Sequence, residues 1–382
     1  MRVLLLLESF DLDDTGLLLH RLCQRWVAQE GDVELQAIGF CEDGPLAERM
    51  RADGIPAEIL PPDASASKVL LKKRAHSIQR MTNPPSLIQA HGRWPFEYGL
   101  RLAEQMPDHP AVFVSHGNEP DAGWLDQLRR RLSERRARAR WQTVLADTQF
   151  GADRLRERGL PAARVQHFPF GVDAIQCHPL GTATRARIRH LADVPEKAPF
   201  VVTDAPPPTS PAGRALIAGI VSVLREYPEA RVRMLDAQAR DSGWDTVLAS
   251  ANLSDRVRVI GQLPEVRPRL LASADVVIQA TLRDGFPLAV AEAMAGAVPV
   301  VAMDHGSVAT LLEQGKTGVL VPPNNAVALA DATGRLLADP AASLKIGQAA
   351  RAAVTEENEL GHVAESFVKL WRGLIGLPTT VA

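Results

Sequence analysis

Residues 283–302 read RDGFPLAVAEAMAGAVPVVA, a segment that is apolar almost throughout but contains one acid, Glu292. The residues on either side of Glu292 predict a helix that is apolar on nearly every face, and such a helix is normally enclosed by protein. A carboxylate buried there needs a partner. Two partners remain open at this point, a bound ligand or a buried arginine.

The loop before this helix favours a ligand. Gly285 allows an unusual backbone turn, and Pro287 suits a first helical turn. The amides of Leu288 and Ala289 are then expected to be unsatisfied, and a helix N-terminus with open amides binds anions such as phosphate. A carboxylate one turn further on can accept hydrogen bonds from both hydroxyls of a ribose. The segment therefore predicts a nucleotide diphosphate site, unless Glu292 is a core acid paired to an arginine and Asp284 an ordinary turn residue.

Composition restricts the class of protein. The chain has 382 residues, 46% of them hydrophobic, with 43 Lys and Arg against 45 Asp and Glu. Residues 1–175 hold 23 of the bases and 24 of the acids, so neither half is a polycation and general nucleic-acid binding is unexpected. The three cysteines, Cys23, Cys41 and Cys177, lack paired or metal-like spacing. The apolar run Val3–Leu7 is too short for a signal peptide or a membrane span, so we expect a cytoplasmic protein.

Two series of strand-like runs alternate with helical stretches, which is typical of α/β domains built on parallel sheets. The first series comprises Val3–Leu7, Glu34–Phe40, Ser86–Gln89, Ala111–Ser115 and Thr143–Ala146. The second comprises a run from Phe200, Val232–Leu235, Val257–Ile260, Val276–Gln279, Val298–Ala302 and Gly318–Val321. The join between them is expected near Gly171–His178.

Asp284 and Glu292, with seven residues between them, resemble the E-x7-E motif of retaining glycosyltransferases of family 4, although the first acid here is Asp. Three further segments, 164–173, 272–277 and 317–323, are also similar to that family. The resemblance implies a GT-B fold, in which two Rossmann-like domains face each other across a cleft. We expect an acceptor-side domain at 1–173, a donor domain at 174–361 and a last helix, 362–382, that crosses back to the first domain.

The resemblance also implies the activity, which is metal-independent transfer of a sugar from a nucleotide-diphosphate donor with no cofactor. The acceptor is a glycan, a lipid-linked glycan or a small metabolite. His116 and Asp284 take the catalytic positions. The expected donor-binding residues are Gly16, Ile260, Arg283, Gly285, Phe286, Leu288, Ala289 and Glu292.

Three of these positions have an ordinary structural alternative. His116 ends a predicted strand and resembles the histidine that faces the donor sugar, but it could be a loop histidine with a structural hydrogen bond. His91 ends the preceding strand and is interpreted as structural. Gly16 resembles a family glycine that lets the backbone approach the donor phosphates, but it could be an ordinary turn glycine. Ile260 resembles the strand end beneath the nucleotide base, but it could be an ordinary strand residue.

The chain departs from the family at the start of the second domain. Family members carry an Arg and a Lys there that neutralise the diphosphate, whereas residues 202–213 read VTDAPPPTSPAG. Loss of both cations would cost several kcal/mol unless another cation replaces them. Arg283 is the first candidate, unless it is simply a solvated loop residue, and Arg214 is the second. A non-catalytic GT-B partner or binding protein, or a GT-B enzyme with an atypical donor, therefore stays as an alternative.

Two basic segments, Lys68–Arg80 and Arg129–Arg140, lie in the expected acceptor domain. The second holds seven arginines and one acid. Both could hold an anionic lipid surface, which would place the protein at the inner face of the membrane. Each could equally be a solvated helix face.

Overall fold

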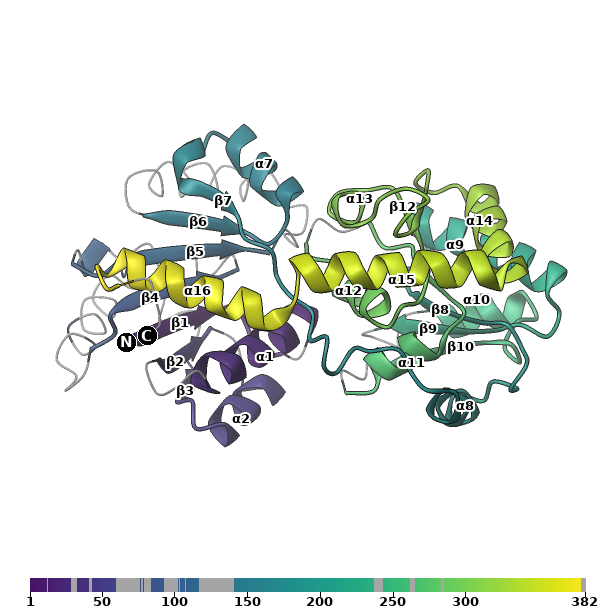
Figure 1. Ribbon diagram of the computed structural model, residues 1–382, viewed down its shortest axis with the longest axis horizontal. Coiled ribbons are helices and arrows are strands. Elements are labelled where there is room, and N and C mark those ends of the chain that lie inside the picture. Colours follow the sequence, from purple (N-terminus) through teal and green to yellow (C-terminus); the bar gives the residue numbers. More distant parts are fainter. Residues whose placement is uncertain are drawn as a thin grey trace. The chain divides into compact units, whose positions relative to one another are not determined.

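The computed structural model describes residues 1–11, 13–28, 33–40, 43–59, 76, 78, 84–92, 102, 104–106, 108–116, 141–236, 243–261, 265–282 and 285–378. The chain divides into two compact units (Figure 1). The N-terminal unit comprises Met1–Phe170 together with Leu360–Ala382. The C-terminal unit comprises Gly171–Glu359.

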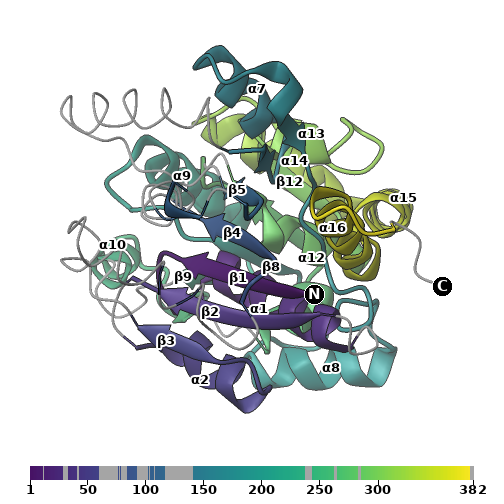
Figure 2. The same cartoon turned by 90° about the vertical axis from the view of Figure 1, so that its left-hand side faces the viewer.

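The N-terminal unit is built on a parallel sheet with the strand order β3-β2-β1-β4-β5-β6-β7, much of which can be followed in Figure 2. Every neighbouring pair in this order is parallel. The strands are β1 (Arg2–Leu7), β2 (Glu34–Gly39), β3 (Ala57–Ile59), β4 (Leu87–His91), β5 (Ala111–Ser115), β6 (Thr143–Ala146) and β7 (Val165–His167).

The helices described in the N-terminal unit are α1 (Asp14–Ala28), α2 (Pro45–Ala52), α7 (Gln149–Glu157) and α16 (Leu360–Leu374), with a short 3-10 turn, η1, at Ala162–Arg164. The last helix, α16, packs on α1 through aromatic side chains. The Trp26 ring lies 5.3 Å from Phe367 and 4.7 Å from Trp371. The Trp26 indole also donates to the Ala364 carbonyl at 3.2 Å. The last segment of the chain is thus part of the N-terminal unit's core.

The C-terminal unit contains a second parallel sheet, with the order β10-β9-β8-β11-β12-β13. Its strands are β8 (Phe200–Asp204), β9 (Arg231–Asp236), β10 (Val257–Gly261), β11 (Val276–Gln279), β12 (Val300–Met303) and β13 (Val319–Val321). Its helices are α8 (Thr182–Leu191), α9 (Pro211–Glu226), α10 (Trp244–Ser250), α11 (Arg267–Ser273), α12 (Leu288–Ala295), α13 (Val308–Leu311), α14 (Ala326–Ala338) and α15 (Pro340–Glu357).

Alternating side chains of these buried strands point to opposite faces of the sheet. Phe200 and Val202 pack in one core cluster with residues of α11, α12 and α15, whereas Val201 packs in a second cluster with residues of α9, α10 and α14. Because both faces are covered, the strands are continuous apolar runs, which is why the sequence pattern located them.

The predicted α/β class with two Rossmann-like parallel sheets is confirmed. Ala111–Ser115, Thr143–Ala146 and Val276–Gln279 match the observed strands at both ends. The run expected at Val298–Ala302 forms a strand only from Val300, and Pro299, which has no N–H to donate, precedes it. Both three-residue strands at the edges of the first sheet, β3 and β7, were missed because so short a run carries no readable period.

Candidate active site

The C-terminal sheet reverses its strand order between β8 and β11, and open α/β sheets bind ligands at the carboxyl ends of the strands beside such a reversal. Asp204 ends β8 at this point. Its carboxylate accepts from the backbone amides of Ala280 and Thr281, both at 2.6 Å, and from the Gln279 side-chain amide at 2.9 Å. The family resemblance predicts two cations near this strand end. The strand end instead holds an acid, Asp204, whose carboxylate is bonded to groups of the protein itself.

The loop from Gly285 to Pro287 is anchored to the segment before α13. Gly285 is buried, and its carbonyl accepts from the Ser307 hydroxyl at 2.6 Å. Helix α12 begins at Leu288, directly after Pro287. The Leu288 amide donates to the Phe286 carbonyl at 2.9 Å, so the expectation that this amide is unsatisfied was wrong. The amide is satisfied because the tight turn places the Phe286 carbonyl, two residues earlier, within hydrogen-bond distance. Contacts of a phosphate with Phe286, Leu288 and the half-buried Ala289 stay predictions.

Glu292 lies on α12 with a fully buried side chain. Its Oε2 accepts from Nε of Arg267, the first residue of α11, at 2.7 Å, and the Arg267 side chain is only 2% exposed. The structure therefore supplies the buried arginine that the sequence left open as a partner. The ion pair also orients the carboxylate, and its contact with a ribose remains a prediction.

The loop that lacks the family's cations is closed by its own backbone. A Cβ atom added at Gly213 would lie 2.2 Å from the Pro207 carbonyl oxygen, so only glycine allows this approach. Arg214 is exposed and donates to the carbonyl of Thr209. Asp284, which we expect to be catalytic, and Arg283, the first candidate for the substitute cation, lie outside the described residues.

Ile260 is the second-last residue of β10, where it pairs with Leu235 of β9. Its half-buried side chain packs against the core cluster that contains α12. These contacts are those of an ordinary strand residue, and its role beneath the nucleotide base stays a prediction.

In the N-terminal unit, His116 follows β5 directly and is bounded by other strand ends. Its Nε2 lies 3.1 Å from Nδ1 of His91 at the end of β4, and its Nδ1 lies 3.6 Å from Oδ2 of Asp147, which follows β6. The Phe170 ring lies 4.9 Å from the imidazole. His91 is fully enclosed, and this burial lowers its pKa well below the usual value, with a smaller contribution from His116.

Gly16 lies in the first turn of α1, and its glycine character has a local cause. A Cβ atom there would lie 2.0 Å from the Asp11 carbonyl oxygen. The Gly16 amide donates to the Asp13 carboxylate at 2.8 Å. Burial raises the pKa of Asp13, and the negative charge of Asp14 acts in the same direction, against the lowering by the Gly16 amide. The close approach at Gly16 is thus to the chain's own backbone, and its contact with donor phosphates stays a prediction.

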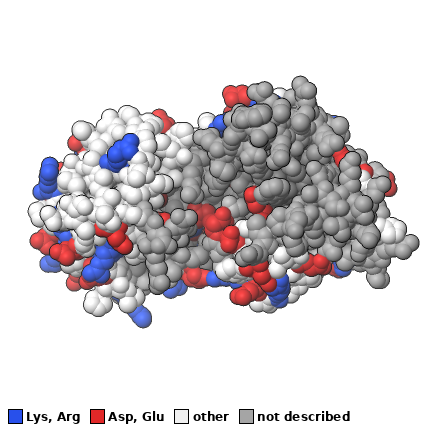
Figure 3. All heavy atoms as spheres, turned by 180° about the vertical axis from the view of Figure 1, so that it is seen from behind, with Lys and Arg blue, Asp and Glu red and all other residues white. Residues whose placement is uncertain are grey.

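Both basic segments named from the sequence, Lys68–Arg80 and Arg129–Arg140, lie outside the described residues apart from His76 and Ile78. On the face shown in Figure 3, basic and acidic side chains are interspersed over the described surface of the C-terminal unit. Within the described residues, no cluster of three or more His, Cys, Asp or Glu side chains is placed to hold a metal ion.

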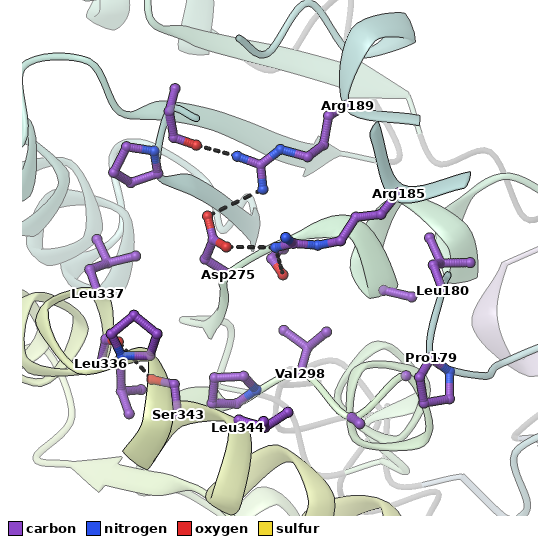
Figure 4. Close-up of a pocket in the computed structure, with 18 of the residues that line it drawn as sticks. Pro179, Leu180, Arg185, Arg189, Asp275, Val298, Leu336, Leu337, Ser343 and Leu344 are labelled. Carbon is purple, nitrogen blue, oxygen red and sulfur yellow. Dashed lines mark hydrogen bonds and ion pairs between the residues drawn. The ribbon is translucent and has the colours of Figure 1, made fainter. Parts of the chain in front are cut away.

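A cavity of about 590 Å³ lies at the opposite end of the C-terminal sheet, before β8, β11 and β12 (Figure 4). Asp275 on its wall is joined to Arg185 at 2.6 Å and to Arg189 at 3.3 Å, and accepts from the Phe200 amide at 2.7 Å. These bonds fix α8 to the sheet. The cavity is at the amino ends of the strands, away from the predicted donor residues, and we assign it no catalytic role.

Sequence reasoning missed three of the side chains described above, Asp204, Arg267 and Asp147. Each gave little signal, because its partner is remote in sequence or follows another strand. Asp147 could have been found, since an acid directly after a buried parallel strand lies at the sheet edge where ligands bind. Arg267, an isolated arginine ahead of an apolar run, was the other readable signal.

Comparisons with known proteins agree with this architecture. A family model described as "Glycosyl transferase 4-like domain" matches residues 16–171, and one described as "Glycosyl transferases group 1" matches residues 216–339. The structure of HepE from Anabaena in complex with UDP superimposes with a TM-score of 0.83 at 19% identity, covering 98% of this chain and 100% of that one. At this identity the likeness shows the fold alone.

Two curated relatives align at moderate identity. The alpha-D-kanosaminyltransferase of Streptomyces kanamyceticus is 26% identical over 69% of this chain and 64% of its own length. A D-inositol 3-phosphate glycosyltransferase of Xylanimonas cellulosilytica is 31% identical over 58% of this chain and 55% of its own length. The chain thus spans less than two thirds of the curated relatives it matches. With its two parallel sheets and both domain models, the chain belongs to the group 1 glycosyltransferases of the GT-B fold.

Proposed function

We propose that this protein is a retaining glycosyltransferase that moves a sugar from a nucleotide-diphosphate donor to a hydroxyl of a glycan, a lipid-linked glycan or a small metabolite. Family membership supports the reaction class. The solved structures of HepE with UDP and with UDP-glucose support a uridine nucleotide as the first donor to test.

The observation that carries the proposal is the buried carboxylate of Glu292, one turn inside α12. It lies on the helix that follows the Gly285–Pro287 loop and the β8–β11 reversal, the place where open α/β sheets bind nucleotides. Arg267 holds the carboxylate at 2.7 Å. We assign Glu292 to the ribose, and Gly285 and Phe286 with the start of α12 to the diphosphate.

The remaining assignments follow the family resemblance. His116 at the end of β5 contacts the sugar, and Asp284 completes the catalytic pair. No metal takes part: the α12 N-terminus, worth about half a charge, and one arginine meet the diphosphate. Removing divalent ions with EDTA is therefore expected to leave the rate unchanged.

A panel of nucleotide sugars tests the reaction. We expect one donor, UDP-glucose being the first choice, to raise the melting temperature and to be turned over, slowly to water or faster to an acceptor. NMR of the product from an α-linked donor should show an α-linkage. A β-linked product would contradict the retaining mechanism, and failure of every donor to bind would contradict the whole assignment.

Arg283 is our first choice for the cation at the diphosphate. We predict that Arg283→Ala lowers kcat more than it weakens binding of the free nucleoside, which has no diphosphate. Arg214→Ala tests the second choice, and Arg225→Ala, an exposed arginine at the end of α9, is the control that should match wild type. Wild-type kcat in both Arg283→Ala and Arg214→Ala would remove both candidates.

A second candidate function, a non-catalytic GT-B partner or binding protein, is favoured by one observation. Asp204 places an acid at the β8 strand end, and the neighbouring loop holds neither of the family's cations. Such a protein would bind nucleotide sugars without turnover, or not bind them at all. Measuring binding and turnover with the same donor separates these two functions. The same measurements across the donor panel would identify an enzyme with an atypical donor.

For location we propose the cytoplasmic face of the membrane, through a peripheral contact of Lys68–Arg80 and Arg129–Arg140. None of the helices in the described part of the chain combines the length and apolarity needed to cross a bilayer. Sedimentation with anionic vesicles, compared with neutral ones, tests the contact, and equal binding to both would contradict it.

A further inference from the structure

A continuous chain of hydrogen bonds in the core of the N-terminal unit leads from α16 to His116. The Trp371 indole Nε1 donates to Oε1 of Gln89 on β4 at 2.7 Å, and the Gln89 amide nitrogen lies 2.8 Å from Nε2 of His91. His91 Nδ1 then lies 3.1 Å from His116 Nε2. Trp371, Gln89 and His91 are all buried, at 0%, 0% and 3% exposure, so water does not compete for these bonds.

The bond between Trp371 and Gln89 determines which group donates in each of the following hydrogen bonds. An indole N–H only donates, so the group of Gln89 that faces Trp371 must be its carbonyl oxygen. The NH₂ of Gln89 therefore faces His91. Since an amide NH₂ only donates, His91 Nε2 must accept.

His91 passes this direction on to His116. Burial keeps the pKa of His91 well below its usual value, so the ring is neutral and carries one proton. With Nε2 accepting, that proton is on Nδ1, and it is donated to Nε2 of His116. With its Nε2 accepting this bond, His116 has its own ring proton on Nδ1, which faces Asp147 Oδ2 at 3.6 Å.

We propose that Trp371, Gln89 and His91 are positioning residues that hold His116 in its Nδ1–H tautomer. The proposal rests on the proposed function, because it concerns the histidine assigned to the sugar. Since Nε2 of His116 already accepts a hydrogen bond, His116 does not take a proton from the acceptor through that atom. His116 instead contributes an imidazole ring held in a fixed orientation, with its Nδ1–H directed toward Asp147.

The tautomers are measured directly by NMR of the full chain labelled with ¹⁵N-histidine, because protonated and unprotonated ring nitrogens have distinct shifts. The signals are assigned by their loss in His116→Asn and His91→Gln. We expect protonated Nδ1 and unprotonated Nε2 in both rings. A protonated Nε2 in His116 would overturn the proposal.

Trp371→Phe keeps an aromatic ring but removes the donor that directs the chain, and Gln89→Met keeps the side-chain volume without its amide. Both should mix the tautomers of His116 and lower kcat by about 10-fold to 100-fold, the range expected for a misplaced catalytic group, with little change in the donor KM. Trp26→Phe is the matched control. Trp26 belongs to the same aromatic cluster as Trp371. Its substitution removes one indole hydrogen bond, to the Ala364 carbonyl, and leaves the hydrogen bonds from Trp371 to His116 intact.

Trp26→Phe should lower the melting temperature about as much as Trp371→Phe while leaving the His116 tautomer and kcat unchanged. Equal loss of kcat in the two variants would show a merely structural role and overturn the proposal, as would an unmixed tautomer in Trp371→Phe. If wild type turns over no nucleotide sugar, the proposed function fails, while the NMR result still decides whether the chain sets the tautomer.

Discussion

Buried ionisable side chains show how strongly single neighbours determine the chemistry of a residue in this protein. Glu292 and Arg267 are both essentially removed from water and joined at 2.7 Å. Losing one partner of such a pair leaves an uncompensated buried charge, which is strongly destabilising. His91 is the neutral counterpart, since it satisfies its ring nitrogens without carrying a charge.

We predict that Glu292→Gln weakens binding of UDP by about 1.5 to 3 kcal/mol, the usual worth of a hydrogen bond to a charged group. Calorimetry with UDP and with its 2′-deoxy and 3′-deoxy analogues measures this. Wild type should bind at least one deoxy analogue more weakly than UDP, and Glu292→Gln should no longer distinguish them.

Arg267→Lys is the control for disturbing the Arg267 Nε–Glu292 Oε2 bond without removing the carboxylate. It keeps the positive charge and the Glu292 carboxylate, so it should lose stability but retain the preference for ribose. If Glu292→Gln folds and keeps wild-type discrimination between the ribose and deoxyribose forms, Glu292 is only the core partner of Arg267.

His91 predicts a pH dependence of stability. In the unfolded chain this histidine takes up a proton near pH 6.5, whereas burial lowers its pKa in the native state. Its contribution to the free energy of unfolding is therefore complete above pH 6.5 and is lost as the pH falls, by about 1.4 kcal/mol per pH unit. His91→Gln should reduce the slope of urea-derived stability against pH by that amount, and an unchanged slope would mean that native His91 protonates freely.

At the scale of elements, side chains at strand ends connect the strands to the loops that carry the candidate site. Asp204 joins the end of β8 to the segment after β11, and Ser307 joins the turn before α13 to the Gly285 carbonyl. The loop that leads into α12 is thus held from two sides. Neither of these two anchors involves the cations that the family resemblance implied.

Asp204→Ala should lower the free energy of unfolding by about 2 to 4 kcal/mol, because two backbone amides and the Gln279 amide lose a charged acceptor. Asp204→Asn, which keeps one acceptor oxygen, should lose about half as much. Denaturant unfolding measures both, and Asp331→Ala on the exposed side of α14 is the control, expected within about 0.5 kcal/mol of wild type. Equal stability of Asp204→Ala and Asp331→Ala would show that these bonds contribute nothing net.

At the scale of the whole molecule, the chain forms two compact units and crosses between them twice. The chain leaves the N-terminal unit at Phe170, builds the C-terminal unit and returns at Leu360. The returning helix brings Phe367 and Trp371, both fully buried, to the core around α1. The stability of the N-terminal unit therefore depends on α16, which follows the whole C-terminal unit in the sequence.

Ending the chain after Glu359 removes α16 and exposes Trp26. Each buried aromatic side chain contributes about 1.5 to 3 kcal/mol, so the N-terminal unit should melt at a much lower temperature. Scanning calorimetry should then resolve two transitions, with that of the C-terminal unit unchanged. An equal shift of both transitions would contradict the independence of the units.

The local sequence pattern by itself determines where many of the buried strands and the α12 helix lie. Buried parallel strands such as Ala111–Ser115 are apolar in sequence because both faces of each sheet are covered, and the 283–302 segment marked the α12 helix with its one buried acid. Those features depend on residues close together in the chain. The partners of the chemically important groups depend on tertiary structure: Arg267 for Glu292, Ala280 for Asp204, and Trp371, 282 residues from Gln89, for the chain that ends at His116. A hydrogen bond needs its two groups within about 3 Å, and only folding of the sheets and the return of α16 brings these groups to that distance.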